Sequence, residues 1–193
     1  CWNELITSFV ITVLVNLNRL IMLTQLINGR ILTPQGWIKD GSVLISNGKI
    51  LEVTNSDLAV IGAKVIDVKG MSVVPGFVGM HIHGGGGHDY TECTAEAFET
   101  ATKAHLLHGA TTVFPTLSST TFDNIRSAAE LCERLMETNK VIKGLHIEGP
   151  YLNPRMAGAQ WADVLKEPER EEYVSLVENT SCIKRWDISP EIK

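Results

Sequence analysis

Strand-like and helix-like segments alternate along residues 73–193, and this alternation limits the possible folds more than any other feature of the sequence. The expected strands cover 73–82, 111–115, 141–148 and 183–189, and the expected helices cover 95–107, 121–137 and 162–177. Alternation of this kind with short connecting loops predicts a parallel sheet. We therefore predict an α/β fold for this part of the chain.

The segment 121–137 carries a clear helix signal. Thr120 and Asp123 offer a capping start. Apolar side chains then recur at helical spacing and predict one buried stripe, made of Ile125, Ala129, Cys132 and Met136.

Residues 74–193 supply about four β/α units, whereas a closed β/α barrel needs eight strands and about 250 residues. We expect this region to be the first half of a (β/α)8 TIM-type barrel, with the rest missing. A four-stranded open α/β sheet is the alternative. No Gly-rich dinucleotide or phosphate fingerprint opens any of the helices, which argues against that alternative.

The region before the barrel, residues 22–73, has short strands and turns and predicts a small β-sandwich domain. Asn28-Gly29 and Asn47-Gly48 are tight-turn signals. The first predicts strand, turn, strand within 26–31. The second predicts a hairpin that pairs 43–45 with 50–53, and another strand is expected at 65–68.

Residues 1–21 are expected to be an upstream leader, with Met22 as the natural start. Their apolar run, 5–15, is shorter than the roughly 20 residues that span a bilayer, and no signal-peptide pattern surrounds it. A short anchor helix or an interface strand is the alternative. We expect no membrane association.

The charge and the cysteines exclude several classes of function. The formal net charge is -5 and no Lys/Arg run occurs, so nothing suggests nucleic-acid binding. The four cysteines form no CxxC pair, which argues against a disulfide framework or a zinc finger and fits a reducing, cytoplasmic setting. They also lack a neighbouring histidine, so a thiol nucleophile is not expected.

Two histidines end the first α/β strand, at His81 and His83. Residues i and i+2 of a strand face the same side, and the carboxyl ends of barrel strands carry the active site. His146 and Glu148 end the third strand with the same spacing. Together, His81, His83 and Glu148 would form the His₂Glu ligand set of catalytic zinc sites. Surface histidines and a solvated carboxylate are the alternative, and two strand ends with paired ligands favour the metal site.

Other polar residues near these strands are less informative. The four glycines at 84–87 fit either a flexible linker or a loop whose backbone approaches substrate closely. His88-Asp89 lies in that loop and could touch substrate. His105 and His108 end a helix, where cations are favourable, so they are interpreted as structural.

Several segments resemble a known family. Residues 74–84 resemble the opening barrel strand of amidohydrolases, and 144–153 are similar to the metal-binding segment of the N-acetylglucosamine-6-phosphate deacetylases. Gly158-Ala159-Gln160 and Ser189-Pro190-Glu191 resemble further segments of that family. The resemblance covers about residues 22–193.

The resemblance implies a role for each matching residue. Glu148 would be the central metal ligand, with His81 and His83 binding a second ion in members that hold two. Gln160, with Ala159 beside it, would contact substrate, and His146 would support the metal ligands. The implied cofactor is zinc or iron, as one or two ions. Gly79 stands where the family usually has Asp, which puts one support of the metal in doubt.

The family reaction is hydrolysis of the N-acetyl group of N-acetylglucosamine 6-phosphate, so the implied partner is a small phosphorylated amino sugar. A cytoplasmic homodimer is implied for the full-length parent. The family's catalytic Asp and two further His ligands lie beyond residue 193, so the isolated chain is expected to be inactive. The alternatives are another metal-dependent amidohydrolase, such as a dihydroorotase or an amino-acid deacetylase, or a truncated fragment without enzymatic function.

Overall fold

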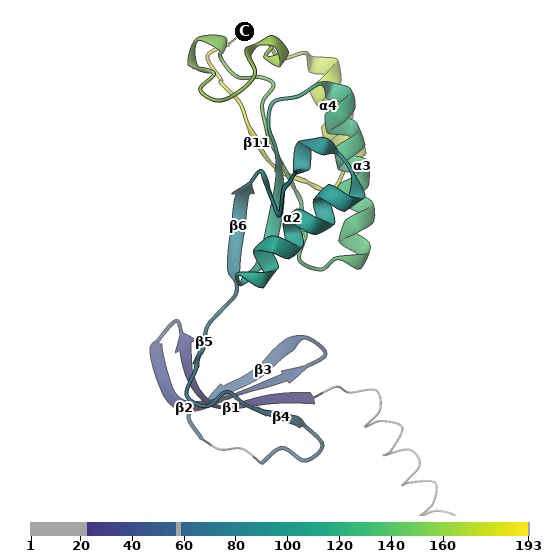
Figure 1. The fold of residues 1–193 in the computed structure, drawn as a ribbon. Helices are drawn as coiled ribbons and strands as arrows, with labels where there is room; N and C mark the ends of the chain where they lie inside the picture. Colours follow the sequence, from purple (N-terminus) through teal and green to yellow (C-terminus); the bar gives the residue numbers. More distant parts are fainter. Residues whose placement is uncertain (1–22, 57–58, 193) are drawn as a thin grey trace, which may run out of the picture. The chain divides into compact units, whose positions relative to one another are not determined.

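The computed structural model describes residues 23–56 and 59–192, so the prediction for the leader, 1–21, lies outside the described residues. The chain divides into two compact units between Pro75 and Gly76 (Figure 1). Each unit has its own sheet, and each is described separately below.

The first unit contains one five-stranded mixed sheet. Its strands are β1 Leu23–Thr33, β2 Gly36–Ser46, β3 Lys49–Thr54, β4 Lys64–Asp67 and β5 Ser72–Val73. The order is β3-β2-β1-β4, with β5 also paired to β1. The predicted hairpin is confirmed: Ser46 pairs with Lys49, and both turn residues have positive φ, 48° at Asn47 and 76° at Gly48. The predicted strand at 65–68 corresponds to β4.

The turn predicted at Asn28-Gly29 is wrong. These residues lie inside the continuous strand β1, where Asn28 has φ 57° and the register against β2 shifts on both sides of Gly29. The same local chemistry that favours a tight turn here permits a β-bulge. The described residues of this unit form a single sheet, so the β-sandwich stays a prediction.

The second unit is built on a four-stranded sheet whose paired strands are all parallel. Its strands are β6 Phe77–Ile82, β9 Ala110–Leu117, β10 Leu145–Glu148 and β11 Ile183–Asp187, in the order β11-β10-β9-β6. The predicted parallel α/β sheet is confirmed, and the partial barrel stays a prediction. The glycine loop forms a short hairpin, with β7 Gly84–Gly85 paired to β8 His88–Asp89.

Three helices lie on the same side of this sheet in Figure 1: α2 Ala95–Leu107, α3 Phe122–Thr138 and α4 Arg170–Asn179. The Thr121 side chain caps α3 by accepting a hydrogen bond from the Asn124 backbone, one residue after the expected cap. In the predicted stripe, Ile125, Ala129 and Cys132 are fully buried, and Met136 packs against the same core.

The helix predicted at 162–177 is only partly correct. Residues Ala162–Val164 form a 3-10 turn, η3, and α4 begins at Arg170. Pro168 lies between them, and a proline restricts the residue before it to extended backbone. Two further 3-10 turns, η1 Tyr90–Glu92 and η2 Pro154–Met156, lie in the loops at the carboxyl end of the sheet.

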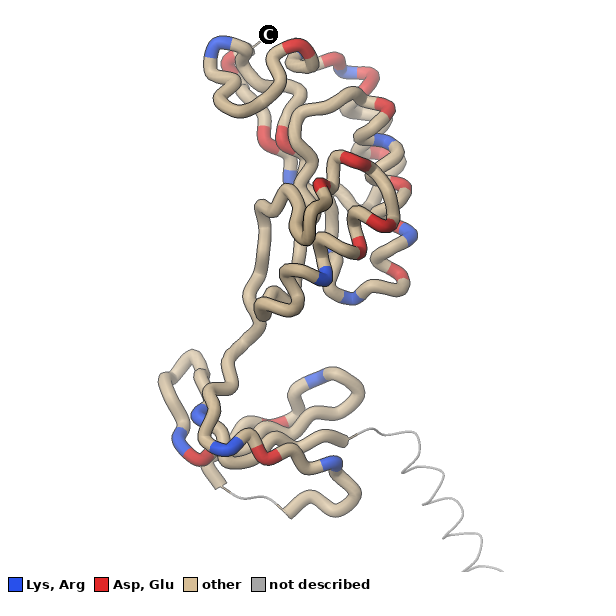
Figure 2. The backbone as a smooth tube through the Cα atoms, viewed as in Figure 1, with Lys and Arg blue, Asp and Glu red and all other residues tan. Residues whose placement is uncertain are grey.

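Lys and Arg positions are interspersed with Asp and Glu along the described backbone (Figure 2). Within residues 23–56 and 59–192, no helical stretch has the length and hydropathy of a transmembrane segment.

Candidate metal centre

His81 and His83 project from the end of β6 toward each other, as predicted. Their Nε2 atoms lie 3.0 Å apart, and the two rings meet edge to face with centroids 4.9 Å apart. The side chains are 41% and 36% exposed, so both imidazoles are in partial contact with solvent. The i, i+2 spacing has therefore placed two imidazole lone pairs in one space.

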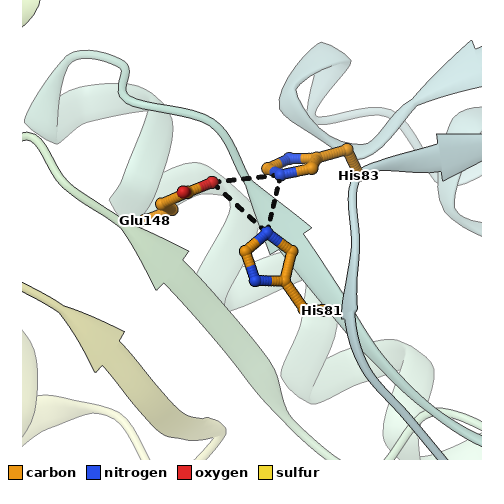
Figure 3. A group of neighbouring side chains, drawn as sticks. All are labelled: His81, His83 and Glu148. Atoms are coloured by element: carbon orange, nitrogen blue, oxygen red, sulfur yellow. Dashed lines mark hydrogen bonds and ion pairs between the residues drawn. The ribbon is translucent and has the colours of Figure 1, made fainter. Parts of the chain in front are cut away.

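Glu148 ends β10 and reaches the same space (Figure 3). Its Oε2 atom lies 3.0 Å from His83 Nε2 and 3.5 Å from His81 Nε2. This oxygen is buried, and no group among the described residues forms a hydrogen bond with it. A buried carboxylate oxygen without a donor is costly unless a cation compensates for it.

The loop after β9 supports His83. Ser118 Oγ lies 3.1 Å from His83 Nδ1, on the side of the ring away from Glu148. The backbone of Ser118 donates to Thr91 Oγ1 at 3.1 Å, and the backbone of Thr91 donates to Asp89 Oδ1 at 2.7 Å. These bonds hold the ring in place and leave Nε2 directed at the shared space. A histidine ligand usually has such a partner on its other nitrogen.

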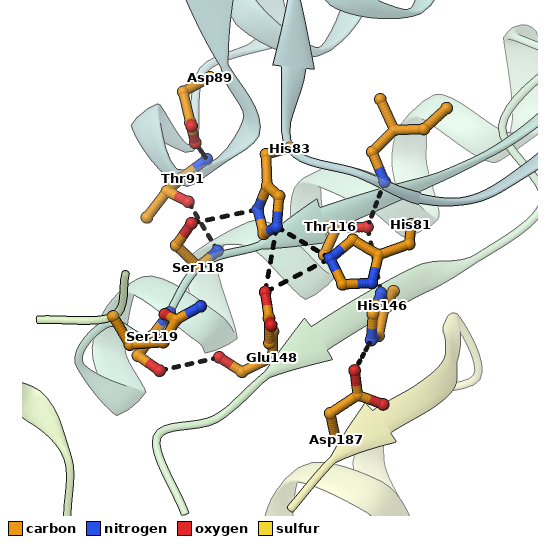
Figure 4. Close-up of polar contacts among 12 residues, drawn as sticks. His81, His83, Asp89, Thr91, Thr116, Ser118, Ser119, His146, Glu148 and Asp187 are labelled. Atoms are coloured by element: carbon orange, nitrogen blue, oxygen red, sulfur yellow. Dashed lines mark hydrogen bonds and ion pairs between the residues drawn. The ribbon is translucent and has the colours of Figure 1, made fainter. Parts of the chain in front are cut away.

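His146 lies behind the ligands and is fully buried (Figure 4). Its Nδ1 is 3.1 Å from Thr116 Oγ1, and its ring meets His81 edge to face at 4.9 Å. Its Nε2 is 3.1 Å from Asp187 Oδ2, close enough for ionic attraction but not aligned for a hydrogen bond. Burial lowers the pKa of His146, and Arg185 and His81 lower it further against the attraction of Asp187.

A second group of potential ligands, His81, His146 and Asp187, shares His81 with the first. The Asp187 carboxylate already has a cation: Arg185 donates to Oδ1 at 3.0 Å and to Oδ2 at 3.2 Å. Burial alone would raise the pKa of Asp187, but the bonds from Arg185 and the charge of His146 hold it below its usual value. With this guanidinium in place, the group of His81, His83 and Glu148 is the better candidate for a metal site.

A family model described as "Amidohydrolase family" matches residues 72–187. The chain belongs to the amidohydrolase family.

Among curated relatives, an N-acetylglucosamine-6-phosphate deacetylase of Haemophilus influenzae is 32% identical over 172 residues, 86% of this chain and 44% of the relative. A dihydroorotase of Staphylococcus epidermidis is 34% identical over 119 residues, 59% of this chain and 26% of that relative. The chain thus spans less than half the length of these relatives.

A crystal structure of N-acetylglucosamine-6-phosphate deacetylase from Pasteurella multocida superposes with a TM-score of 0.83 at 21% identity, over 89% of this chain and 46% of that one. This likeness shows that the amidohydrolase chain has the same mixed α/β fold with a parallel sheet.

Gln160, the predicted substrate contact, lies close to the ligand strand of this amidohydrolase. Its Oε1 accepts a hydrogen bond from the Ser119 backbone at 2.8 Å, and Ser119 Oγ donates to the Glu148 carbonyl at 3.0 Å. The segment that holds Gln160 is thereby tied to the end of β10. Its neighbour Ala159 is exposed.

Two of the remaining histidines of this amidohydrolase, His88 and His105, have side-chain partners nearby. His105 Nε2 lies 2.8 Å from the Gly84 carbonyl, so it connects α2 to the glycine hairpin. His88 Nδ1 lies 3.1 Å from Glu92 Oε2 within the same loop. His108 is the C-cap residue of α2. Neither His105 nor His108 belongs to a potential metal-binding group of the described residues.

Gly79 takes the place of the expected Asp. A Cβ atom at this position would overlap Ile82 Cδ1. The β6 register against β9 shifts between these two residues. Here Ile82 fills the space in which a side chain at position 79 would lie.

Sequence reasoning missed Thr116, Ser118 and Asp187. Asp187 could have been found by the strand-end rule that found Glu148, because the two residues pair in register at the ends of β10 and β11. The two hydroxyl residues carry no comparable signal, since Ser and Thr are common in loops and at strand ends.

Proposed function

We propose that His81, His83 and Glu148 hold a divalent metal ion in a parent enzyme that hydrolyses the N-acetyl group of N-acetylglucosamine 6-phosphate. The observation that carries this proposal is the buried Oε2 of Glu148, which faces two imidazole nitrogens at 3.0 and 3.5 Å and has no hydrogen-bond donor among the described residues.

The three ligand atoms fit a metal by their chemistry. Two imidazole nitrogens and one carboxylate oxygen form a set that suits zinc and also iron. When bound, such an ion would supply Lewis-acid activation of the carbonyl group that is hydrolysed. The chain's own residues fix the ligands: Ser118 orients the ring of His83, and the buried His146 packs against His81.

The choice of substrate rests on the relatives and on the segment of Gln160. We infer that Gln160 and Ala159 contact the amino sugar, since Ser119 links this segment to the backbone of Glu148. The family's catalytic carboxylate and the remaining half of a barrel would come from the rest of the parent. The homodimer and the cytoplasmic location stay predictions.

A dihydroorotase-like activity is the second candidate, because dihydroorotases are among the relatives. Such enzymes more often carry a modified lysine as a bridging ligand on the fourth barrel strand. Lys184 is the only lysine of β11, and as the second residue it lies near the amino end of the strand, whereas Asp187 lies at the carboxyl end. A Cβ at Gly144, the residue before β10, would meet the stem of Lys184. Lys184 therefore lies toward the other end of the sheet from Glu148, which favours the deacetylase.

The test is acetate release from N-acetylglucosamine 6-phosphate by the purified full-length parent. Activity should disappear after treatment with a chelator and return with zinc or iron. Hydrolysis of dihydroorotate is measured beside it. Turnover of dihydroorotate without acetate release would reject the deacetylase, and full activity after complete metal removal would reject the metal site.

A further inference from the structure

The hydroxyl of Thr116 contacts both strands that carry the candidate ligands. We propose that Thr116 is a positioning residue, which holds the His81–His83 segment and the His146–Glu148 segment in the register that a metal ion needs. This inference rests on the proposed function, because it assigns a role toward the ion that His81, His83 and Glu148 are proposed to hold.

Thr116 replaces a backbone group in the ladder between β6 and β9. Ile82, the residue between the two histidines, pairs with Pro115, and the register is irregular at this point. The Ile82 backbone donates to Thr116 Oγ1 at 2.8 Å, and this hydroxyl donates to the Phe114 carbonyl at 3.2 Å. The hydroxyl is thus inserted between a donor of β6 and an acceptor of β9.

The same hydroxyl reaches the next strand. Thr116 Oγ1 lies 3.1 Å from Nδ1 of His146, which stands two residues before Glu148 on β10 (Figure 4). Thr116 and His146 are both fully buried, so water does not compete for these contacts. One hydroxyl oxygen therefore joins β6 to β10 across β9.

Loss of this hydroxyl has a specific consequence for the ligands. A Thr116→Val side chain has nearly the same shape but cannot accept from the Ile82 N–H or meet His146 Nδ1. Ile82, the residue between His81 and His83, then loses its hydrogen bond to β9. The two histidines of β6 and the Glu148 segment of β10 can then shift relative to each other. Supporting residues of this kind typically change metal affinity by roughly 10- to 100-fold.

The experiment measures zinc affinity of the 193-residue chain by competition with a chromophoric chelator, and follows coordination geometry with the absorption spectrum of cobalt(II). Thr116→Val should weaken zinc binding roughly 10- to 100-fold and alter the cobalt spectrum. Thr116→Ser retains the hydroxyl and should restore both. Thr116→Ala replaces the valine variant if the latter does not fold.

Thr102→Val is the matched control. Thr102 is also buried, and its hydroxyl lies 3.1 Å from the Tyr90 hydroxyl, away from the candidate ligands. This variant should lower thermal stability without changing zinc affinity. Equal zinc affinity in Thr116→Val and the wild type, or equal weakening by Thr102→Val, would overturn the role of Thr116.

Glu148→Gln separates this inference from the proposed function. If the wild type binds zinc, Glu148→Gln loses it and Thr116→Val does not, only the role of Thr116 is rejected. If the wild type does not bind zinc, or Glu148→Gln binds it equally well, the metal site and the role of Thr116 are both rejected.

Discussion

His83 and Glu148 meet at 3.0 Å although their strands are not neighbours in the sheet. His83 follows β6 and Glu148 ends β10, and β9 lies between them. The two side chains therefore come together over the end of the intervening strand. This convergence depends on the staggering of three strand ends, so it is sensitive to residues that set that stagger.

Glu148→Gln should reduce zinc affinity by more than the roughly 10- to 100-fold typical of a supporting residue. The amide keeps the shape of the side chain but removes the negative charge from the ligand set. Isothermal titration of the chain with zinc measures the effect. Glu130→Gln, at an exposed position of α3, is the charge-matched control and should bind zinc as the wild type does.

Ser118→Ala should weaken zinc binding within the same roughly 10- to 100-fold range as other losses of a ligand's partner. Without the hydroxyl 3.1 Å from Nδ1, the ring of His83 is free to rotate away from Glu148. Ser127→Ala, at an exposed position of α3, serves as the control. An unchanged zinc affinity in Ser118→Ala would show that the ring is held by packing alone.

The stability of the second unit should depend on Glu133 in a pH-dependent way. The Ser181 backbone and side chain donate to Glu133 Oε1 at 2.5 and 3.0 Å, and the backbone bond is the main cause that lowers the pKa of Glu133. A lowered folded-state pKa gives stability that is present above the unfolded value, about 4.3, and is lost as the pH falls through the folded value. Glu133→Gln should therefore melt at a lower temperature than the wild type at pH 7.

The same two proteins should melt closer together as the pH approaches the folded-state pKa of Glu133. Thermal unfolding followed by circular dichroism across the acid range checks this. A gap that stays constant with pH would mean that the glutamine variant acts through packing and not through the charge.

The isolated 193-residue chain should bind zinc yet release no measurable acetate from N-acetylglucosamine 6-phosphate. The family's catalytic carboxylate is expected beyond residue 193, and general acid-base help is worth typically about 10²–10⁴-fold. The full-length parent is the positive control, and comparable rates for the two proteins would show that the chain contains its own base.

Much of the second unit could be predicted from the sequence because its signals are local and repeated. The segment 95–107 matches α2, and the buried stripe of α3 follows from helical spacing. Glu148 and His83 could be placed together because parallel strands end at one edge of the sheet. Each of these inferences uses only the spacing of residues along the sequence or the shared direction of parallel strands.

The remaining features depend on contacts between strands, which the spacing of residues along the sequence does not encode. The left-handed conformation of Asn28 would suit a tight turn as well as the bulge that is observed. Only the pairing of the strand with its neighbour decides between the two. The contacts of Thr116 arise because Ile82 faces Pro115 across the ladder. A hydroxyl gains such a role from the register of neighbouring strands, which spacing along one strand cannot give.

The overlap between Ile82 and a side chain at position 79 also couples these two positions. The atom that a Cβ at position 79 would meet first is Cδ1, the far end of the Ile82 side chain, so an aspartate there would require a change of the Ile82 rotamer. The Ile82 backbone, which donates to Thr116, would not have to move. A substitution at Gly79 is therefore felt first in the packing of Ile82.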